Sequence, residues 1–112
     1  MRVFHYSSVR ADNVEGGATK TKVRWLIDKK LGAPNFALRF FEMAPGGYSP
    51  LHSHSWEHEV FILSGEGQLL DGRNALSFKI GDVIFVPPNE QHQFKNTSKN
   101  ALEFLCLIPN EK

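Results

Sequence analysis

The sequence predicts a single domain built from β-strands, arranged as a barrel or a sandwich. Short apolar runs recur along the chain and are interrupted by turn residues, as at Pro45-Gly46-Gly47 and Pro87-Pro88-Asn89, a pattern typical of all-β folds. No segment has the length and periodicity of an α-helix. At 112 residues the chain has the size of one compact domain, so residues 1–112 are expected to form one unit.

Each apolar run is a candidate strand, and the turn residues separate the runs. Asp71-Gly72 suits the positive φ angles of a tight hairpin turn. Residues 12–20, which include two glycines, are expected to form a surface loop, and residues 110–112 a polar tail. The expected strands are residues 3–6, 21–27, 36–43, 59–63, 67–71, 75–78, 82–86, 91–95 and 102–108.

Composition argues against several classes of partner. The 13 basic and 12 acidic residues give a net charge of +1, so charge gives no case for binding nucleic acid or an anionic membrane. The single cysteine, Cys106, excludes an internal disulfide framework. The first residues lack the apolar run of a signal peptide, and no run is long enough to span a membrane. We therefore expect a cytoplasmic location.

Four of the five histidines form one pattern: His52, His54, His58 and His92. Side chains alternate between the two faces of a strand, so His52 and His54 point the same way if their segment is extended. His58 shares its face with Val60 and Ile62, and His92 with Phe94. The alternative is that each histidine is solvated or hydrogen-bonded on its own, but such histidines would not need to share one spacing and one face. Since imidazole is the commonest protein ligand of transition metals, the pattern predicts a metal site. His5 lies outside it.

The residues around these histidines resemble the two motifs of the cupin superfamily. The first motif spans residues 45–59 and ends at Gly65, and the second runs from Gly81 through His92 to Asn96. More narrowly, the chain is similar to small single-domain manganese cupins of thermophilic bacteria. That resemblance implies a jelly-roll-like double-stranded β-barrel, a homodimer, and one divalent metal per chain. It implies His52, His54, His58 and His92 as the ligands.

Two positions depart from the general cupin pattern. Most cupins have a glutamate ligand where this chain has His58, and the adjacent Glu59 is an alternative ligand that the spacing to Gly65 disfavours. Asn89 replaces a glycine, and asparagine tolerates the left-handed conformation better than most residues. Four neutral imidazoles leave the full charge of the metal uncompensated, so the site should attract anions. Manganese is the expected metal, with iron, zinc, nickel or copper as alternatives.

Other residues are candidates for a pocket around the metal. Apolar side chains that share a face with the histidines are expected to form its wall or the ordinary core of the barrel. Cys106 is more simply a buried small side chain than a reactive thiol. Arg39 is either a surface residue or an interior cation that holds an anionic substrate. Glu57 and Glu59 are expected to hydrogen-bond the outer nitrogens of ligand imidazoles. The expected pocket residues are Arg39, Val60, Ile62, Phe94, Phe104, Cys106 and Ile108.

Three functions fit these expectations. The first is a metal-dependent oxidoreductase, a dioxygenase or peroxide-using oxygenase acting on a small unsaturated or enolic compound. The second is a non-redox isomerase or lyase in which the metal polarises a carbonyl, which the absence of an obvious general base ranks lower. The third is a small-molecule-binding protein without turnover. The fold alone does not decide among them.

Overall fold

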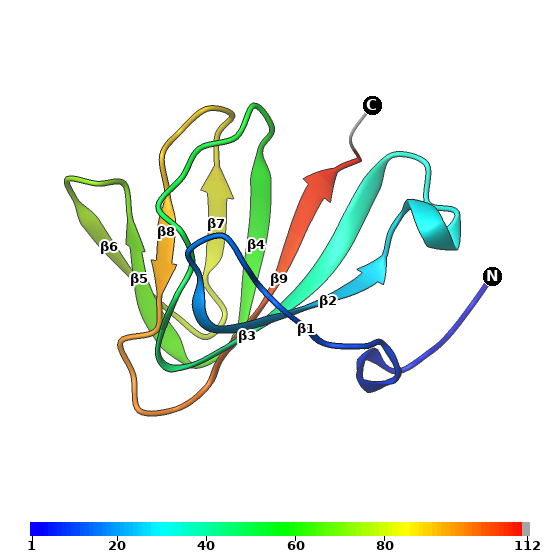
Figure 1. Ribbon diagram of the computed structural model, residues 1–112, viewed down its shortest axis with the longest axis horizontal. Coiled ribbons are helices and arrows are strands. Elements are labelled where there is room, and N and C mark those ends of the chain that lie inside the picture. Colours follow the sequence, from blue (N-terminus) through cyan, green and yellow to red (C-terminus); the bar gives the residue numbers. More distant parts are fainter. Residues whose placement is uncertain (111–112) are drawn as a thin grey trace.

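The computed structural model describes residues 1–110, and they form one strongly curled antiparallel sheet. Figure 1 shows β5, β6 and β8 on one side of the molecule and β2, β3 and β9 on the other, with β4 and β7 between them. The strand order along the sheet is β6-β5-β8-β3-β9-β4-β7, with β2 also pairing β3 and β1 pairing β2. The strands are β1 (Asp12–Asn13), β2 (Thr19–Ile27), β3 (Phe36–Tyr48), β4 (His58–Ser64), β5 (Glu66–Leu70), β6 (Ala75–Lys79), β7 (Val83–Val86), β8 (Gln93–Lys95) and β9 (Leu102–Pro109).

The expected all-β class is confirmed, and eight of the predicted strands correspond to β2 through β9. Strand β3 is longer than predicted, because its pairing continues through Gly47 to Tyr48, which pairs with both Thr19 and Lys95. The only helices among residues 1–110 are two short 3-10 turns, Tyr6–Ser8 and Lys29–Leu31. Neither is long and apolar enough to cross a membrane.

The predicted strand at residues 3–6 is wrong. Local hydrogen bonds shape this segment instead: the Ser7 backbone N–H donates to the His5 ring at 3.2 Å, and the Ser8 hydroxyl donates to the His5 carbonyl at 2.7 Å. These bonds favour the 3-10 turn η1 (Tyr6–Ser8) over an extended strand. The N-terminal segment therefore lies as an arm beside the sheet (Figure 1).

The predicted loop at residues 12–20 is also partly wrong, because it contains β1. Asp12 pairs with Val23 and Asn13 with Lys22 at the edge of β2. Of the predicted tail, Asn110 is fixed, since its side-chain amide donates to the Ala33 carbonyl at 2.8 Å. Residues 111–112 lie outside the described residues.

The core fills the concave side of the curled sheet. Its side chains alternate along each strand with outward-facing ones, as in β4, where His58, Val60 and Ile62 are buried and Glu59 and Phe61 are exposed. This confirms the predicted facing of β4, and β9 alternates in the same way. The buried cluster consists of Met43, Val60, Ile62, Phe78, Ile84, Val86, Phe94, Leu102, Phe104 and Cys106.

Candidate metal centre

The two histidine motifs meet because the segments that carry them pair through their backbones. The His52 N–H donates to the His92 carbonyl at 3.1 Å, and the His92 N–H donates to the His52 carbonyl at 2.8 Å. A further bond joins the Asn89 N–H to the His54 carbonyl at 2.6 Å. Asn89 has a φ of 68°, so the left-handed conformation expected from its place in the motif is present.

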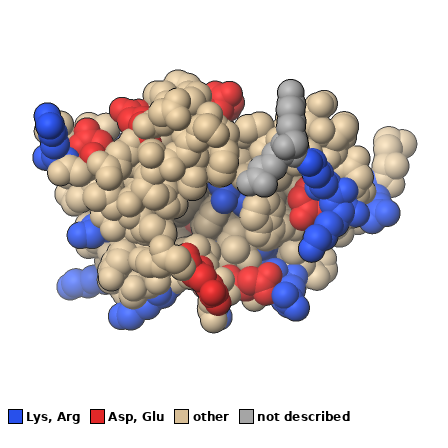
Figure 2. All heavy atoms as spheres, turned by 45° about the horizontal axis from the view of Figure 1, so that its top comes forward, with Lys and Arg blue, Asp and Glu red and all other residues tan. Residues whose placement is uncertain are grey.

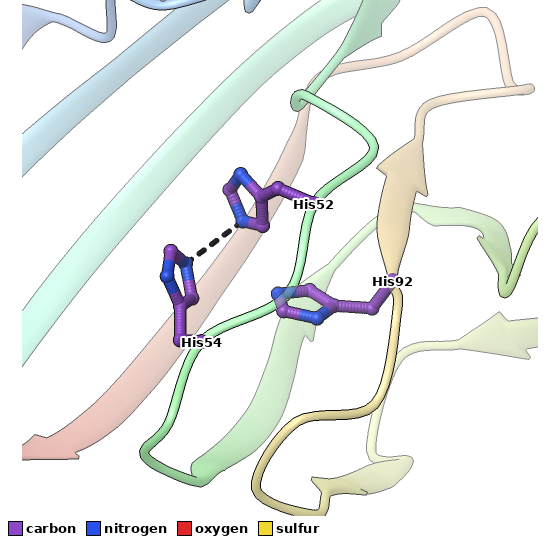
Figure 3. Close-up of side chains that lie close together, drawn as sticks. All are labelled: His52, His54 and His92. Carbon is purple, nitrogen blue, oxygen red and sulfur yellow. Dashed lines mark hydrogen bonds between the residues drawn. The ribbon is translucent and has the colours of Figure 1, made fainter.

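Figure 3 shows the side chains of His52, His54 and His92 converging from the two segments. Each offers a ring nitrogen, and these nitrogens lie within 4.8 Å of one another. The Nε2 atoms of His52 and His54 are 3.0 Å apart. Two nitrogens bound about 2.1 Å from one metal at right angles would lie roughly 3.0 Å apart, so this pair already has the spacing of neighbouring ligands.

His58 lies beside these three rings at the start of β4. Its ring centroid is 4.8 Å from that of His92 and 5.3 Å from that of His54. The side chain is buried, and its Nε2 has no hydrogen-bond partner among the described residues. A buried polar atom without a partner is costly. A metal bound to Nε2 would remove that cost, so the residues present fit a metal ion.

The alternative ligand, Glu59, faces the other way. It is exposed, because alternation along β4 places it on the outer side of the sheet. Of these two residues, only His58 points towards the other three histidines.

Burial favours the neutral form of His52, His54 and His58. Desolvation, followed by the charges of His92 and Arg39, lowers the pKa of His58 to about 3. Desolvation, followed by the charges of His54, His92 and Arg39, lowers the pKa of His52 to about 4. Desolvation also lowers the pKa of His54. Neutral imidazole is the form that binds metals, so at pH 7 these rings hold free lone pairs without first losing a proton.

The outer nitrogens have partners other than the expected glutamates. The Nδ1 of His92 lies 3.0 Å from the Glu90 carbonyl, and the Nδ1 of His58 lies 3.4 Å from the Cys106 sulfur. Glu57 and Glu59 are both exposed, and within residues 1–110 neither hydrogen-bonds an imidazole. The expectation for these two residues is wrong because the turn and strand β4 direct their side chains outward.

The histidines open into a pocket of about 340 Å³. Of the expected wall residues, Arg39, Phe94, Phe104 and Cys106 line it. Val60 and Ile62 lie in the core and Ile108 packs against the core, so for these three the ordinary-core alternative holds. Stacked rings form one wall: the centroids of Phe41 and Phe104 are 5.1 Å apart, and those of Phe94 and Phe104 are 5.0 Å apart.

Strands β1 and β2 supply the part of the pocket that the sequence did not indicate. Asp12 and Glu15 line it from the β1 segment, and Trp25 from β2. No motif marks these residues. The pairing of β1 with β2 brings the β1 segment to the pocket, and Trp25 lies opposite Arg39 where β2 pairs with β3. Figure 2 shows a hollow on this face, with a basic side chain inside it and acidic side chains along its rim. A larger hollow of about 1020 Å³ lies beneath the N-terminal arm, but no histidine lines it.

Arg39 is half-buried and lines the pocket, so the pocket alternative fits it better than a place on the outer surface. Its guanidinium carbon lies 4.8 Å from the ring centroid of Phe41 and 5.4 Å from that of Trp25. Its Nη2 donates to the Cys106 sulfur at 3.0 Å. Cys106 is buried, as expected, and burial raises the pKa of its thiol although the charge of Arg39 opposes the shift.

Comparison with curated proteins gives partial matches. The chain is 39% identical over 75 residues to 1-methylthio-D-xylulose 5-phosphate methylsulfurylase of Rhodospirillum rubrum, a match that covers 67% of this chain and 48% of that protein. It is 34% identical over 74 residues to auxin-binding protein 1 of Arabidopsis thaliana, covering 58% of this chain and 37% of that protein. The matches therefore span half or less of the length of these curated relatives.

Solved structures match over nearly the whole chain. The polyketide cyclase RemF from Streptomyces resistomycificus aligns with a TM-score of 0.93 and 38% identity, covering 99% of this chain and 80% of that one. A predicted oxalate decarboxylase from Thermotoga maritima aligns with a TM-score of 0.85 and 28% identity, covering 98% of this chain and 100% of that one. The second match confirms the expected similarity to small single-domain bacterial cupins. Residues 39–108 match the cupin domain family, and the chain belongs to this family.

Proposed function

We propose that this cupin is a metal-dependent enzyme that acts on a small enolisable carbonyl compound without net oxidation. One observation carries the proposal: His52, His58 and His92 line an aromatic pocket, and His54 lies beside them. His52, His54, His58 and His92 would hold one divalent metal per chain. When bound, the metal would act as a Lewis acid that polarises a carbonyl oxygen of the substrate.

The chain's own residues supply the other requirements of such a reaction. The wall of Phe41, Phe94 and Phe104 excludes water and offers flat surfaces to an unsaturated substrate. Glu15, exposed at the mouth of the pocket, is the candidate proton acceptor for the carbon next to the carbonyl. Asp12 lines the same wall but is paired with Arg10 at 2.7 Å, which makes it a weaker base.

Two findings favour the non-redox reaction over the oxygenase that the sequence ranked first. The sequence indicated no general base, whereas carboxylates line the pocket. The second finding is the 38% identity to a polyketide cyclase over 99% of this chain. The second candidate function is an oxidoreductase. It is favoured because four histidine ligands on a six-coordinate metal would leave two positions open within an apolar pocket.

The metal itself stays a proposal. Manganese is expected from the resemblance, but a set of imidazole nitrogens also suits zinc, iron, nickel and copper. A Lewis-acid reaction accepts redox-inert zinc, whereas an oxygenase needs a metal that changes oxidation state.

Cyclisation of heptane-2,6-dione tests the proposed function. In this intramolecular aldol condensation a carbon–carbon bond forms and water leaves, so no oxidant is needed. We expect turnover with zinc or manganese in the absence of oxygen, abolished in His52→Ala, reduced at least tenfold in Glu15→Gln, and unchanged in His5→Ala. The oxidoreductase would be established if enolic probes were turned over only in the presence of oxygen, with one oxygen molecule consumed for each product molecule. Ligand binding without turnover under either condition would leave a binding protein.

A further inference from the structure

Arg39 projects from the central strand β3 into the histidine pocket, where its positive charge is held between aromatic rings. The guanidinium lies near the faces of Trp25 and Phe41, a cation–π arrangement that stabilises an arginine within an apolar pocket. The rings also fix the plane of the guanidinium. The Nη2 of Arg39 lies 3.4 Å from the Nδ1 of His58. The positive charge is therefore held beside the histidines.

The donors of Arg39 are only partly used. Nη2 donates to the Cys106 sulfur at 3.0 Å, a weak acceptor. Nε is buried and has no hydrogen-bond partner among the described residues. Within residues 1–110 the only ion pair joins Arg10 to Asp12, so no carboxylate of the described residues pairs with Arg39. An interior cation without an anionic partner is costly, and proteins usually pair such charges.

Arg39 shares its pocket with a second unpartnered polar atom. The unpartnered Nε2 of His58 belongs to the same pocket. The pocket therefore holds two buried nitrogens without a partner among the described residues: the Nε of Arg39, and the Nε2 of His58, which suits a metal. A bound metal would add positive charge to the pocket, so both sites favour an anionic ligand.

We propose that Arg39 is an anion-binding subsite, and that the pocket takes a small, flat, unsaturated compound carrying a carboxylate or an enolate. Its anionic group would accept hydrogen bonds from the guanidinium, whose planar fork matches a carboxylate. Its unsaturated body would lie against Phe41 and Phe104, and its carbonyl oxygen would point towards the histidines. A volume of about 340 Å³ is at the small end for ligand pockets, which limits the compound to about one or two rings. Only the placement of the carbonyl oxygen towards the histidines rests on the proposed function.

Benzoate and the neutral benzamide are matched probes for this subsite, because they differ in charge and hardly in shape. Calorimetric titration is carried out on protein stripped of metal by a chelator. We expect benzoate to bind roughly tenfold more tightly than benzamide, since a hydrogen bond to a charged group contributes more than a neutral one. The preference should disappear in Arg39→Gln, persist in part in Arg39→Lys, and stay unchanged in Lys22→Gln, a control at an exposed position of β2.

A second measurement uses the unaltered protein and does not depend on a variant folding. In ¹H–¹⁵N spectra the Nε–H signal of Arg39 should shift on addition of benzoate and not of benzamide. Equal affinity for the two probes, or a preference that survives in Arg39→Gln, would overturn the subsite whether or not metal binds. A benzoate preference in a protein that takes up no metal would support the subsite while the proposed function fails.

Discussion

The backbones of His52 and His92 are hydrogen-bonded to each other in both directions, at 3.1 and 2.8 Å. This isolated antiparallel bridge joins segments that are far apart in the sequence. The candidate ligands therefore come together only when the sheet curls and brings the two segments side by side. A metal bound there would hold the same closure, so we expect metal binding to be coupled to folding.

Metal removal should lower the thermal stability of the protein. A metal at 100 times its dissociation constant stabilises the folded state by about 2.7 kcal/mol, which corresponds to roughly 10 °C in a domain of this size. Differential scanning calorimetry with and without chelator checks this, and His52→Ala should have the same melting temperature in both conditions. A melting temperature that the chelator leaves unchanged in wild-type protein would contradict the coupling.

Asn96 should stabilise the fold rather than take part in the chemistry. Its buried amide nitrogen donates to the carbonyls of Met43 at 2.9 Å and Asn100 at 2.8 Å. In Asn96→Asp a carboxylate would face both carbonyls, so we expect a loss of about 2–3 kcal/mol in the free energy of unfolding, measured by urea denaturation. Asn35→Asp, at an exposed position, is the control and should cost little. Equal effects of the two substitutions would refute this role.

Metal-free protein should become less stable as the pH falls from about 6.5 towards 4. In the folded protein the pKa is about 3 for His58 and about 4 for His52, against 6.5 for an ordinary histidine. Within this window the unfolded chain binds protons that the folded chain does not, so the free energy of unfolding rises with pH and is lost on acidification. His92, Arg39, His54 and His52 are the charged or titratable neighbours that oppose protonation of His58.

Urea titrations of the metal-free protein at pH 7, 6 and 5 measure this dependence. The slope between pH 6.5 and 5 should be shallower in His58→Gln, which removes the group with the lowest pKa of these histidines. A free energy of unfolding that is constant over this range in wild-type protein would show that the folded histidines titrate normally.

The cupin resemblance implies a homodimer, and the outer face of the sheet suggests which residues would form its interface. Phe61, Val83 and Phe85 are 46%, 73% and 58% exposed. Phe61 pairs with Val83 across β4 and β7, and β7 ends the strand order. A contiguous apolar surface at a sheet edge is typical of an interface. We expect a second copy of the chain to cover it, because an isologous contact buries the same patch on both copies.

Analytical ultracentrifugation tests the dimer. Wild-type protein should sediment as a dimer at micromolar concentration, and Val83→Glu with Phe85→Glu should be monomeric. Leu76→Glu, which alters an exposed apolar residue of β6, should leave the dimer intact. A monomeric wild-type protein would show that this face is not covered by a second copy.

The strands and the burial of His58 and His92 could be predicted because both depend on local rules. Alternation along a strand places His58 with Val60 and Ile62, and His92 with Phe94. Gly65 is a motif residue whose position requires glycine. Its φ is +83°, and a Cβ there would lie 2.6 Å from the Ala101 carbonyl oxygen. A glycine at such a position can be recognised in the sequence, because few other residues adopt that backbone conformation or fit that space.

The walls of the pocket could not be predicted, because they depend on pairing between distant segments. Glu15 reaches the pocket only because β1 pairs with β2, and two residues of strand leave too little pattern to recognise. Arg39 lies between Phe40 and Leu38, so the sequence offered no parity by which to place it inside. Val60 and Ile62 point inward as predicted but lie in the core, since facing does not determine depth.

Metal stoichiometry in matched histidine variants tests the central claim most directly. Wild-type protein, His58→Ala and His5→Ala are dialysed against manganese or zinc and analysed for bound metal per chain, with circular dichroism to confirm folding. The four-histidine centre predicts about one metal ion in wild type and His5→Ala, and at least a tenfold weaker affinity in His58→Ala. No stoichiometric metal in wild type would contradict the account, and undiminished affinity in His58→Ala would reduce the centre to His52, His54 and His92.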